Sequence, residues 1–240
     1  MTAPAARVIG LDIDTADIRA ADHLLHRLAA RLPLPAGALA CTHRLRVPEP
    51  RVGLSLELPD TRWASALWHR LTAPDLREEL REVGGTELTA VLGDRLLTPA
   101  PTVSTDPGGG AGGTVPGGAV IPGSGGDRRE TGERAAPAPR AARAAAAAPR
   151  ADGVRAVLFP GSAGVPGTLT IGELLRTTAI ERAEVLGGAV PQEGAPLDTR
   201  GHLRPEWRDG SLLLRLVPVV GGRYMPFDVP DPHPCCADHA

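Results

Sequence analysis

The chain has 240 residues, with 26 basic and 28 acidic side chains and a formal net charge of −2. All the basic residues are arginine, so no lysine is available for a P-loop, a Schiff base or a kinase-type phosphate contact. Residues 1–98 hold 12 arginines against 13 carboxylates and residues 153–240 hold 8 against 10, so neither segment has the positive excess of a nucleic-acid-binding protein.

The sequence indicates a cytoplasmic protein that does not associate with a membrane. No basic stretch followed by an apolar run opens the chain, and no run of 18 apolar residues occurs, so neither a signal peptide nor a membrane span is predicted. The three cysteines form an odd set, which favours reduced thiols over a disulfide framework.

Residues 1–98 show the hydrophobic periodicities of six elements in the order β-α-β-β-α-β. The predicted elements cover, in chain order, residues 9–13, 18–32, 41–47, 52–58, 61–83 and 88–92. This order favours a ferredoxin-like α/β sandwich, in which two helices cover one face of a single sheet.

Polar residues on the predicted N-terminal strands have structural interpretations. Asp12 alternates with apolar neighbours and is expected on the solvent face of its strand, while Asp14 or Thr15 is expected to cap the following helix. His43 falls on the same side of its strand as Cys41, so we expect a buried or half-buried histidine rather than a metal ligand.

Residues 99–152 are rich in glycine, proline, alanine and arginine and contain no aromatic side chain. Such a segment buries too little apolar area to offset its ordering entropy. It is therefore predicted to be a disordered linker, with at most a short helical turn near residues 140–148, which would leave two separate folded bodies.

Residues 153–230 are predicted to form a small β-rich α+β module. An apolar strand over 154–159 is followed by a capping box at Thr170 and Glu173, which predicts a short helix. A strand over 183–186 comes next, and Asp209-Gly210 is a hairpin signal that would pair two later strands. The whole chain is therefore expected to belong to the α+β class.

The segment Pro160–Gly164 reads Pro-Gly-Ser-Ala-Gly, one substitution from the Gly-x-Ser-x-Gly nucleophile elbow. A hydrolase reading would use Ser162 with Asp198 and either His202 or His233. Against it, some 85 residues are too few for an α/β-hydrolase sheet, so a plain strand-to-helix loop is favoured, with an anion cradle as an alternative.

Residues 231–240 form a tail with four potential metal ligands: His233, Cys235, Cys236 and His239. Zinc or copper(I) favours such side chains, and Cys41 with His43 could add further ligands. Because adjacent cysteines chelate one tetrahedral ion poorly, an incidental tail is preferred to a metal or redox site.

No complete catalytic constellation is found in the sequence. We therefore expect a non-enzymatic protein without a cofactor, which binds a small ligand or a protein partner of unknown identity, but no nucleic acid. A metal-binding or thiol-redox protein that uses the tail is the alternative, and a hydrolase with Ser162 is a weaker one.

Overall fold

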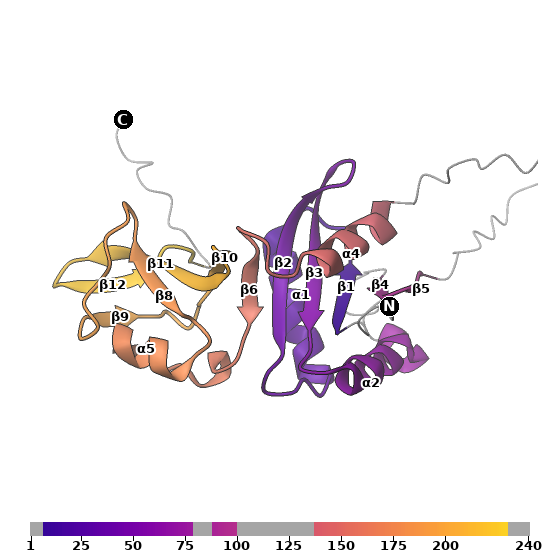
Figure 1. The fold of residues 1–240 in the computed structure, drawn as a ribbon, viewed down its shortest axis with the longest axis horizontal. Helices are drawn as coiled ribbons and strands as arrows, with labels where there is room; N and C mark the ends of the chain where they lie inside the picture. The colour runs from indigo at the N-terminus through magenta and orange to yellow at the C-terminus, as the bar shows by residue number, and fades with distance from the viewer. Residues whose placement is uncertain (1–6, 79–87, 100–136, 230–240) are drawn as a thin grey trace, which may run out of the picture.

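The computed structural model describes residues 7–78, 88–99 and 137–229 (Figure 1). The strands are β1 (Val8–Asp12), β2 (Leu39–Arg46), β3 (Pro50–Glu57), β4 (Thr89–Leu92), β5 (Arg95–Leu97), β6 (Arg155–Leu158), β7 (Thr168–Thr170), β8 (Arg182–Val185), β9 (Pro196–Asp198), β10 (Glu206–Arg208), β11 (Ser211–Val219) and β12 (Arg223–Pro226). The helices are α1 (Ile18–Arg31), α2 (Thr61–Thr72), α4 (Pro137–Ala147), the short α5 (Ile171–Thr177) and the 3-10 turn η1 (Ser162–Gly164). The fold is mixed α+β, as the sequence predicts.

In the described ranges the strands join into one sheet of twelve. Its order is β5-β4-β1-β3-β2-β6-β10-β11-β12-β9-β7, with β8 beside β11. The strand β6 lies between an N-terminal half of the sheet, made of β1 to β5, and a C-terminal half, made of β7 to β12. It pairs with β2, where Cys41 is opposite Ala156, and with β10, where Arg155 is opposite Glu206. The halves that the sequence suggests as separate bodies therefore share a continuous sheet (Figure 1).

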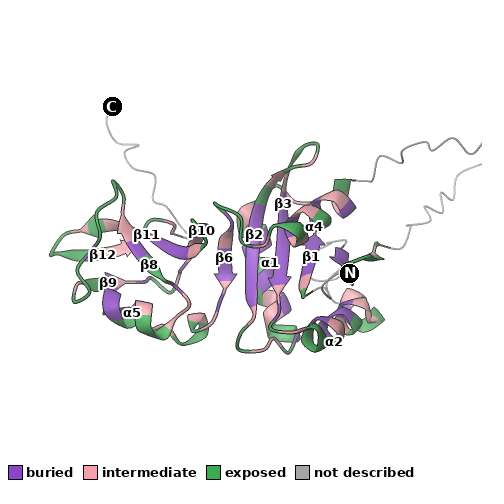
Figure 2. Ribbon diagram, in the orientation of Figure 1, coloured by how far each residue is buried: buried purple, intermediate pink, exposed green. Residues whose placement is uncertain are grey.

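The N-terminal half buries one face of its sheet under α1 and α2. Alternating side chains of β1 and β3, such as Ile9, Leu11 and Leu54, form a cluster with Leu25 of α1 and Leu67 of α2. The period of two along each strand and of three to four along each helix brings these apolar positions onto facing surfaces. Figure 2 shows the buried residues concentrated along β1, β2, β3 and β6.

The opposite face of this sheet carries α4, within the segment that the sequence predicts to be a disordered linker. The prediction of disorder is wrong for residues 137–147, which form this helix. The short helical turn expected near residues 140–148 is the part of the prediction that points to it. Residues 100–136 lie outside the described residues. Ala142 and Ala145 of α4 are fully buried. A Cβ on Gly10 would stand 1.9 Å from the carbonyl oxygen of Ala142, and one on Gly53 would stand 3.2 Å from the methyl group of Ala145. The helix is held by close backbone approach, which small side chains on both surfaces allow.

The C-terminal half has its own apolar cluster, which includes Leu174 of α5, Leu214 of β11 and Trp207 of β10. Cys41 of β2 belongs to the same cluster, so the two halves share core as well as sheet. The capping box is confirmed, because the Thr170 hydroxyl accepts from the backbone N–H of Glu173 and the Glu173 carboxylate accepts from that of Thr170. The hairpin of β10 and β11 is confirmed as well: Asp209 between them has a φ of 52° and the glycine after it a φ of 77°.

Two details of the N-terminal half differ from the sequence interpretation. Asp17, rather than Asp14 or Thr15, caps α1 by accepting from the backbone N–H of Arg19. Asp14 instead has a φ of 54°, outside the helix.

No helix in the described part of the chain is long and apolar enough to cross a membrane.

Candidate functional site: an arginine-lined pocket

A pocket of about 680 Å³ opens where the two halves of the sheet meet. On one side it is bounded by the first turns of α1 and by β2. On the other side it is bounded by β6, β10, β11 and the residues that follow β12. Its volume falls in the range of pockets that hold small molecules, about 300–1,000 Å³.

The lining of this pocket is strongly basic, although the chain as a whole is nearly neutral. Three carboxylates line it, from Asp22, Glu206 and Asp228. Six arginines line it as well: Arg19, Arg44, Arg155, Arg204, Arg208 and Arg215. We call this set with the carboxylates the arginine pocket. The excess of positive charge, partly enclosed by protein, favours an anionic occupant.

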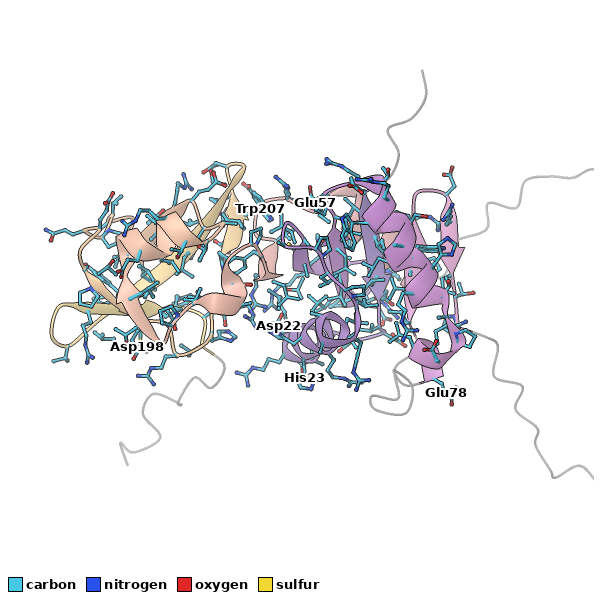
Figure 3. All side chains as sticks on the ribbon, turned by 90° about the horizontal axis from the view of Figure 1, so that it is seen from below. Asp22, His23, Glu57, Glu78, Asp198 and Trp207 are labelled. Atoms are coloured by element: carbon cyan, nitrogen blue, oxygen red, sulfur yellow. The ribbon has the colours of Figure 1, made fainter. Side chains whose placement is uncertain are left out.

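At the floor of the arginine pocket, Asp22 of α1 joins the two halves. One carboxylate oxygen, Oδ2, lies 2.8 Å from Nε of Arg204 and 3.3 Å from Nη2 of Arg155. Asp22 is only 7% exposed, so this bridge is shielded from solvent. In Figure 3, Asp22 lies on the side of α1 that faces the C-terminal half. Its second carboxylate oxygen is buried and has no partner in the described residues.

Asp228, just after β12, places a second carboxylate in the same region. Its Oδ2 accepts from Nη2 of Arg155 at 2.5 Å, and its Oδ1 lies 3.7 Å from Nε2 of His202. Partial burial would raise the pKa of this carboxyl, but His202 and the charge of Arg155 outweigh it, so the pKa of Asp228 lies below its usual value. Asp228 therefore stays ionised around neutral pH.

The wall formed by β10 and β11 carries a third charged group. The carboxylate of Glu206 accepts from Nε of Arg215 at 2.6 Å and from Nη2 of Arg208 at 3.2 Å. Burial alone would raise the pKa of Glu206, yet these two arginines bring the pKa below its usual value. The single carboxylate of Glu206 thus accepts hydrogen bonds from two guanidinium groups. Other N–H donors of these two arginines are left without a bond to it.

Several donors of the arginine pocket have no acceptor within the described ranges. Nε and Nη1 of Arg155 and Nε of Arg208 are buried and have no hydrogen-bond acceptor, whereas the buried Nε2 of His202 has the Asp228 carboxylate at 3.7 Å. Arg19 and Arg44 are exposed at the pocket and form no ion pair with a described carboxylate. A buried donor without an acceptor costs about 1–3 kcal/mol. Because these atoms are closed to solvent in this structure, a ligand with acceptor oxygens would recover that cost by displacing a side chain that covers them.

The same pocket has an apolar side. Ile18 of α1 and Leu214 of β11 line it, and Leu186 and Phe227 contribute large apolar side chains that are 43% and 55% exposed. Apolar walls with a few polar groups in fixed places are typical of small-molecule sites.

The residues of the hydrolase hypothesis are not brought together. Ser162 lies in η1 and lines a smaller pocket of about 220 Å³, whereas His202 lines the arginine pocket. The Ser162 hydroxyl accepts from the backbone N–H of Phe159 at 3.2 Å. Asp198 pairs with Arg200 at 3.2 Å, and Figure 3 shows it away from the junction of the halves. His233 lies outside the described residues.

The tail ligands His233, Cys235, Cys236 and His239, proposed for zinc, also lie outside the described residues. Cys41 and His43, their suggested partners, are described and both are buried. Nε2 of His43 is 2.8 Å from the Ser55 hydroxyl. Burial lowers the pKa of His43 to about 4 and raises that of the Cys41 thiol to about 12. Across the described ranges, no group of three or more His, Cys, Asp or Glu side chains is placed to hold a metal ion.

The carboxylates of Asp12 and Asp14, at and after the end of β1, both pair with Arg51. Asp12 is fully buried, which corrects its expected place on the solvent face. Its Oδ2 lies 2.7 Å from Nη1 of Arg51, and Nη2 of the same arginine donates to Asp14. Burial raises the pKa of Asp12, although the charge of Arg51 opposes that shift.

Sequence reasoning missed the arginine pocket because its residues are scattered. The six arginines lie between positions 19 and 215, on elements from both halves, and no local cluster marks them. Each half is close to neutral, so the charge balance conceals the local excess. The local excess of positive charge arises only when β6 joins the two parts of the sheet and brings these arginines together.

Comparison with models of protein families finds no match to this chain, and comparisons with curated proteins and with solved structures find none either. No relative therefore supplies a ligand or an activity. Among the described residues, the arginine pocket is the feature that most directly indicates a function.

Proposed function

We propose that the protein binds a small anionic ligand in the arginine pocket and that it does so without a chemical step. The observation that supports this most directly is the surplus of guanidinium groups over carboxylates in one partly enclosed cavity, with buried donors left unpaired. Guanidinium groups bind carboxylate and phosphate oxygens with charge-assisted hydrogen bonds. Of the two kinds of partner expected from the sequence, this favours a small molecule over a protein.

The proposal includes a cytosolic setting and a ferredoxin-like arrangement for the N-terminal half. The strand order β4-β1-β3-β2, antiparallel throughout, supports that arrangement, with α1 and α2 packed on one face. In this view the pocket forms where the edge strand β2 is extended by β6. The N-terminal half supplies α1 and Arg44, and the C-terminal half supplies the other wall.

The test is the thermal unfolding midpoint of the full chain in increasing phosphate, pyrophosphate or citrate, with chloride used to keep ionic strength constant. We expect at least one of these anions to raise the midpoint with a saturable dose response, because a ligand that binds the folded state alone stabilises it by mass action. Saturation separates binding from screening, which has no fixed stoichiometry.

Matched variants locate the binding. The double variant Arg19→Gln with Arg44→Gln removes two exposed pocket charges that hold no described carboxylate, so it should fold normally and lose most of the anion response. Arg62→Gln is the control, since Arg62 is 90% exposed on α2 and outside the pocket. The same response in the double variant as in the control, or no saturable response at all, would refute the proposal.

A further inference from the structure

We infer that the ligand of the arginine pocket is an organic carboxylate with an apolar body, and that its carboxylate takes the place that Asp228 occupies in this structure. This inference rests on the proposed function and narrows it to a ligand class. It depends on two observations: a carboxylate already bound at the floor of the pocket, and apolar side chains held exposed beside it.

Asp228 shows where a ligand carboxylate would bind. It contributes one oxygen at 2.5 Å from Nη2 of Arg155 and the other at 3.7 Å from Nε2 of His202. Its side chain is 41% exposed, against 10% for Asp22, so it is the more accessible of the two carboxylates that contact Arg155. Nε and Nη1 of Arg155 are left without acceptors by this arrangement. A carboxylate not tethered to the chain can approach the guanidinium group with both oxygens, which the short aspartate side chain does not do here.

Two apolar side chains beside this position are exposed while their backbones are fixed. The backbone N–H of Phe227 donates to the carbonyl of Arg215 at 2.9 Å, and that of Leu186 donates to the carbonyl of Leu216 at 2.9 Å. Their exposure of 55% and 43% is therefore set by the sheet and does not come from a loose loop. With Leu214 and Ile18 they line the same pocket as Asp228.

This combination distinguishes an apolar carboxylate from an inorganic anion. Phosphate would satisfy the guanidinium groups but would leave Phe227 and Leu186 in water. A ligand with an aromatic or aliphatic body covers them at the same time. Burying one large apolar side chain or its equivalent in ligand surface is worth about tenfold or more in affinity. The apolar wall should therefore dominate selection among anions of equal charge.

The test uses 6-bromo-2-naphthoate, its neutral amide 6-bromo-2-naphthamide, acetate and inorganic phosphate, titrated calorimetrically into the full chain at constant ionic strength. We expect the naphthoate to bind at least about tenfold more tightly than the amide, acetate or phosphate. Phe227→Ala should weaken the naphthoate about tenfold and leave phosphate unchanged. Asp228→Asn should tighten the naphthoate severalfold, because it removes the competing charge.

Val220→Ala serves as the control, because Val220 is 93% exposed and outside the pocket. If phosphate binds as tightly as the naphthoate, or if Phe227→Ala has no more effect than Val220→Ala, the apolar class is wrong while anion binding stands. If Asp228→Asn leaves the naphthoate affinity unchanged or weakens it, the assigned head-group position is wrong. If no anion binds, the proposed function and this inference both fail.

Discussion

At the scale of single residues, two buried polar side chains of the N-terminal sheet, those of His43 and Ser55, bond to each other. His43 of β2 is 2% exposed, and its Nε2 lies 2.8 Å from the hydroxyl of Ser55 on the neighbouring strand β3, where Gly53 is the residue paired with His43. Burial disfavours the imidazolium form and lowers the pKa of His43 to about 4, against 6.5 for an unburied histidine. The native state therefore requires a neutral histidine at this position.

Acid should destabilise the protein through His43. Between pH 6.5 and 4 the unfolded chain binds a proton at this histidine that the folded chain does not, so stability is complete above pH 6.5 and falls with pH through that window. The loss attributable to His43 is about 3 kcal/mol. His43→Gln keeps a hydrogen-bonding group for Ser55 and should show a smaller decrease in urea-unfolding free energy from pH 7 to 4.

The exposed His69 of α2 provides the control for this comparison. His69→Gln should keep the acid dependence of the parent chain. Equal pH dependence in all three proteins would show that His43 is not held neutral by burial.

At the scale of elements, α4 illustrates how an alanine-rich segment can be firmly packed. Its buried positions Ala141, Ala142 and Ala145 recur at helical spacing and lie on the strands that carry Gly10 and Gly53. Exposed Arg143 lies between these buried alanines, so the helix is amphipathic with small side chains as its inner face. Close approach replaces bulky side chains as the means of excluding water.

Gly10→Ala tests this packing. The added methyl would stand 1.9 Å from the carbonyl oxygen of Ala142, so either α4 or β1 has to move. We expect a loss of about 2 kcal/mol or more in urea-unfolding free energy. Gly167→Ala is the matched change at a glycine with open space around it. A loss at Gly10 no larger than the loss at Gly167 would mean that α4 does not pack on β1.

Much of the local structure could be predicted from the sequence, because it depends on near neighbours. The alternation of Ile9 and Leu11, the capping box at Thr170 and the turn at Asp209 each reflect an interaction within a few residues. The failures involve long-range contacts. The packing of α4 on the sheet depends on glycines more than 80 residues away in sequence. The arginine pocket depends on the pairing of β2 with β6. Composition cannot show such contacts, since alanine and arginine occur in linkers as well as in packed elements.

At the scale of the whole molecule, the two halves are joined by more than backbone pairing. Arg150, between α4 and β6, makes two 2.8 Å hydrogen bonds to Glu57 of β3. Its guanidinium carbon lies 4.8 Å from the ring centre of Trp207 on β10. Figure 3 shows Glu57 and Trp207 close to each other at the junction. One side chain thereby connects the N-terminal sheet, the segment after α4 and the C-terminal half.

Arg150→Lys keeps the charge but loses the paired hydrogen bonds and the planar stacking, so we expect the free energy of unfolding to decrease by about 1 kcal/mol. Arg62→Lys, at a highly exposed ion pair on α2, should change it by much less. Equal effects of the two substitutions in urea denaturation would contradict a joining role for Arg150.

We propose that the junction of the halves forms a binding pocket for an organic carboxylate with an apolar body. An anomalous diffraction map from crystals of the full chain soaked with 6-bromo-2-naphthoate tests it most directly. We expect a bromine peak beside Phe227 and Leu186, with the carboxylate density on Arg155 and the Asp228 side chain displaced. A bromine peak only outside the arginine pocket, or no bound naphthoate at saturating concentration, would contradict it.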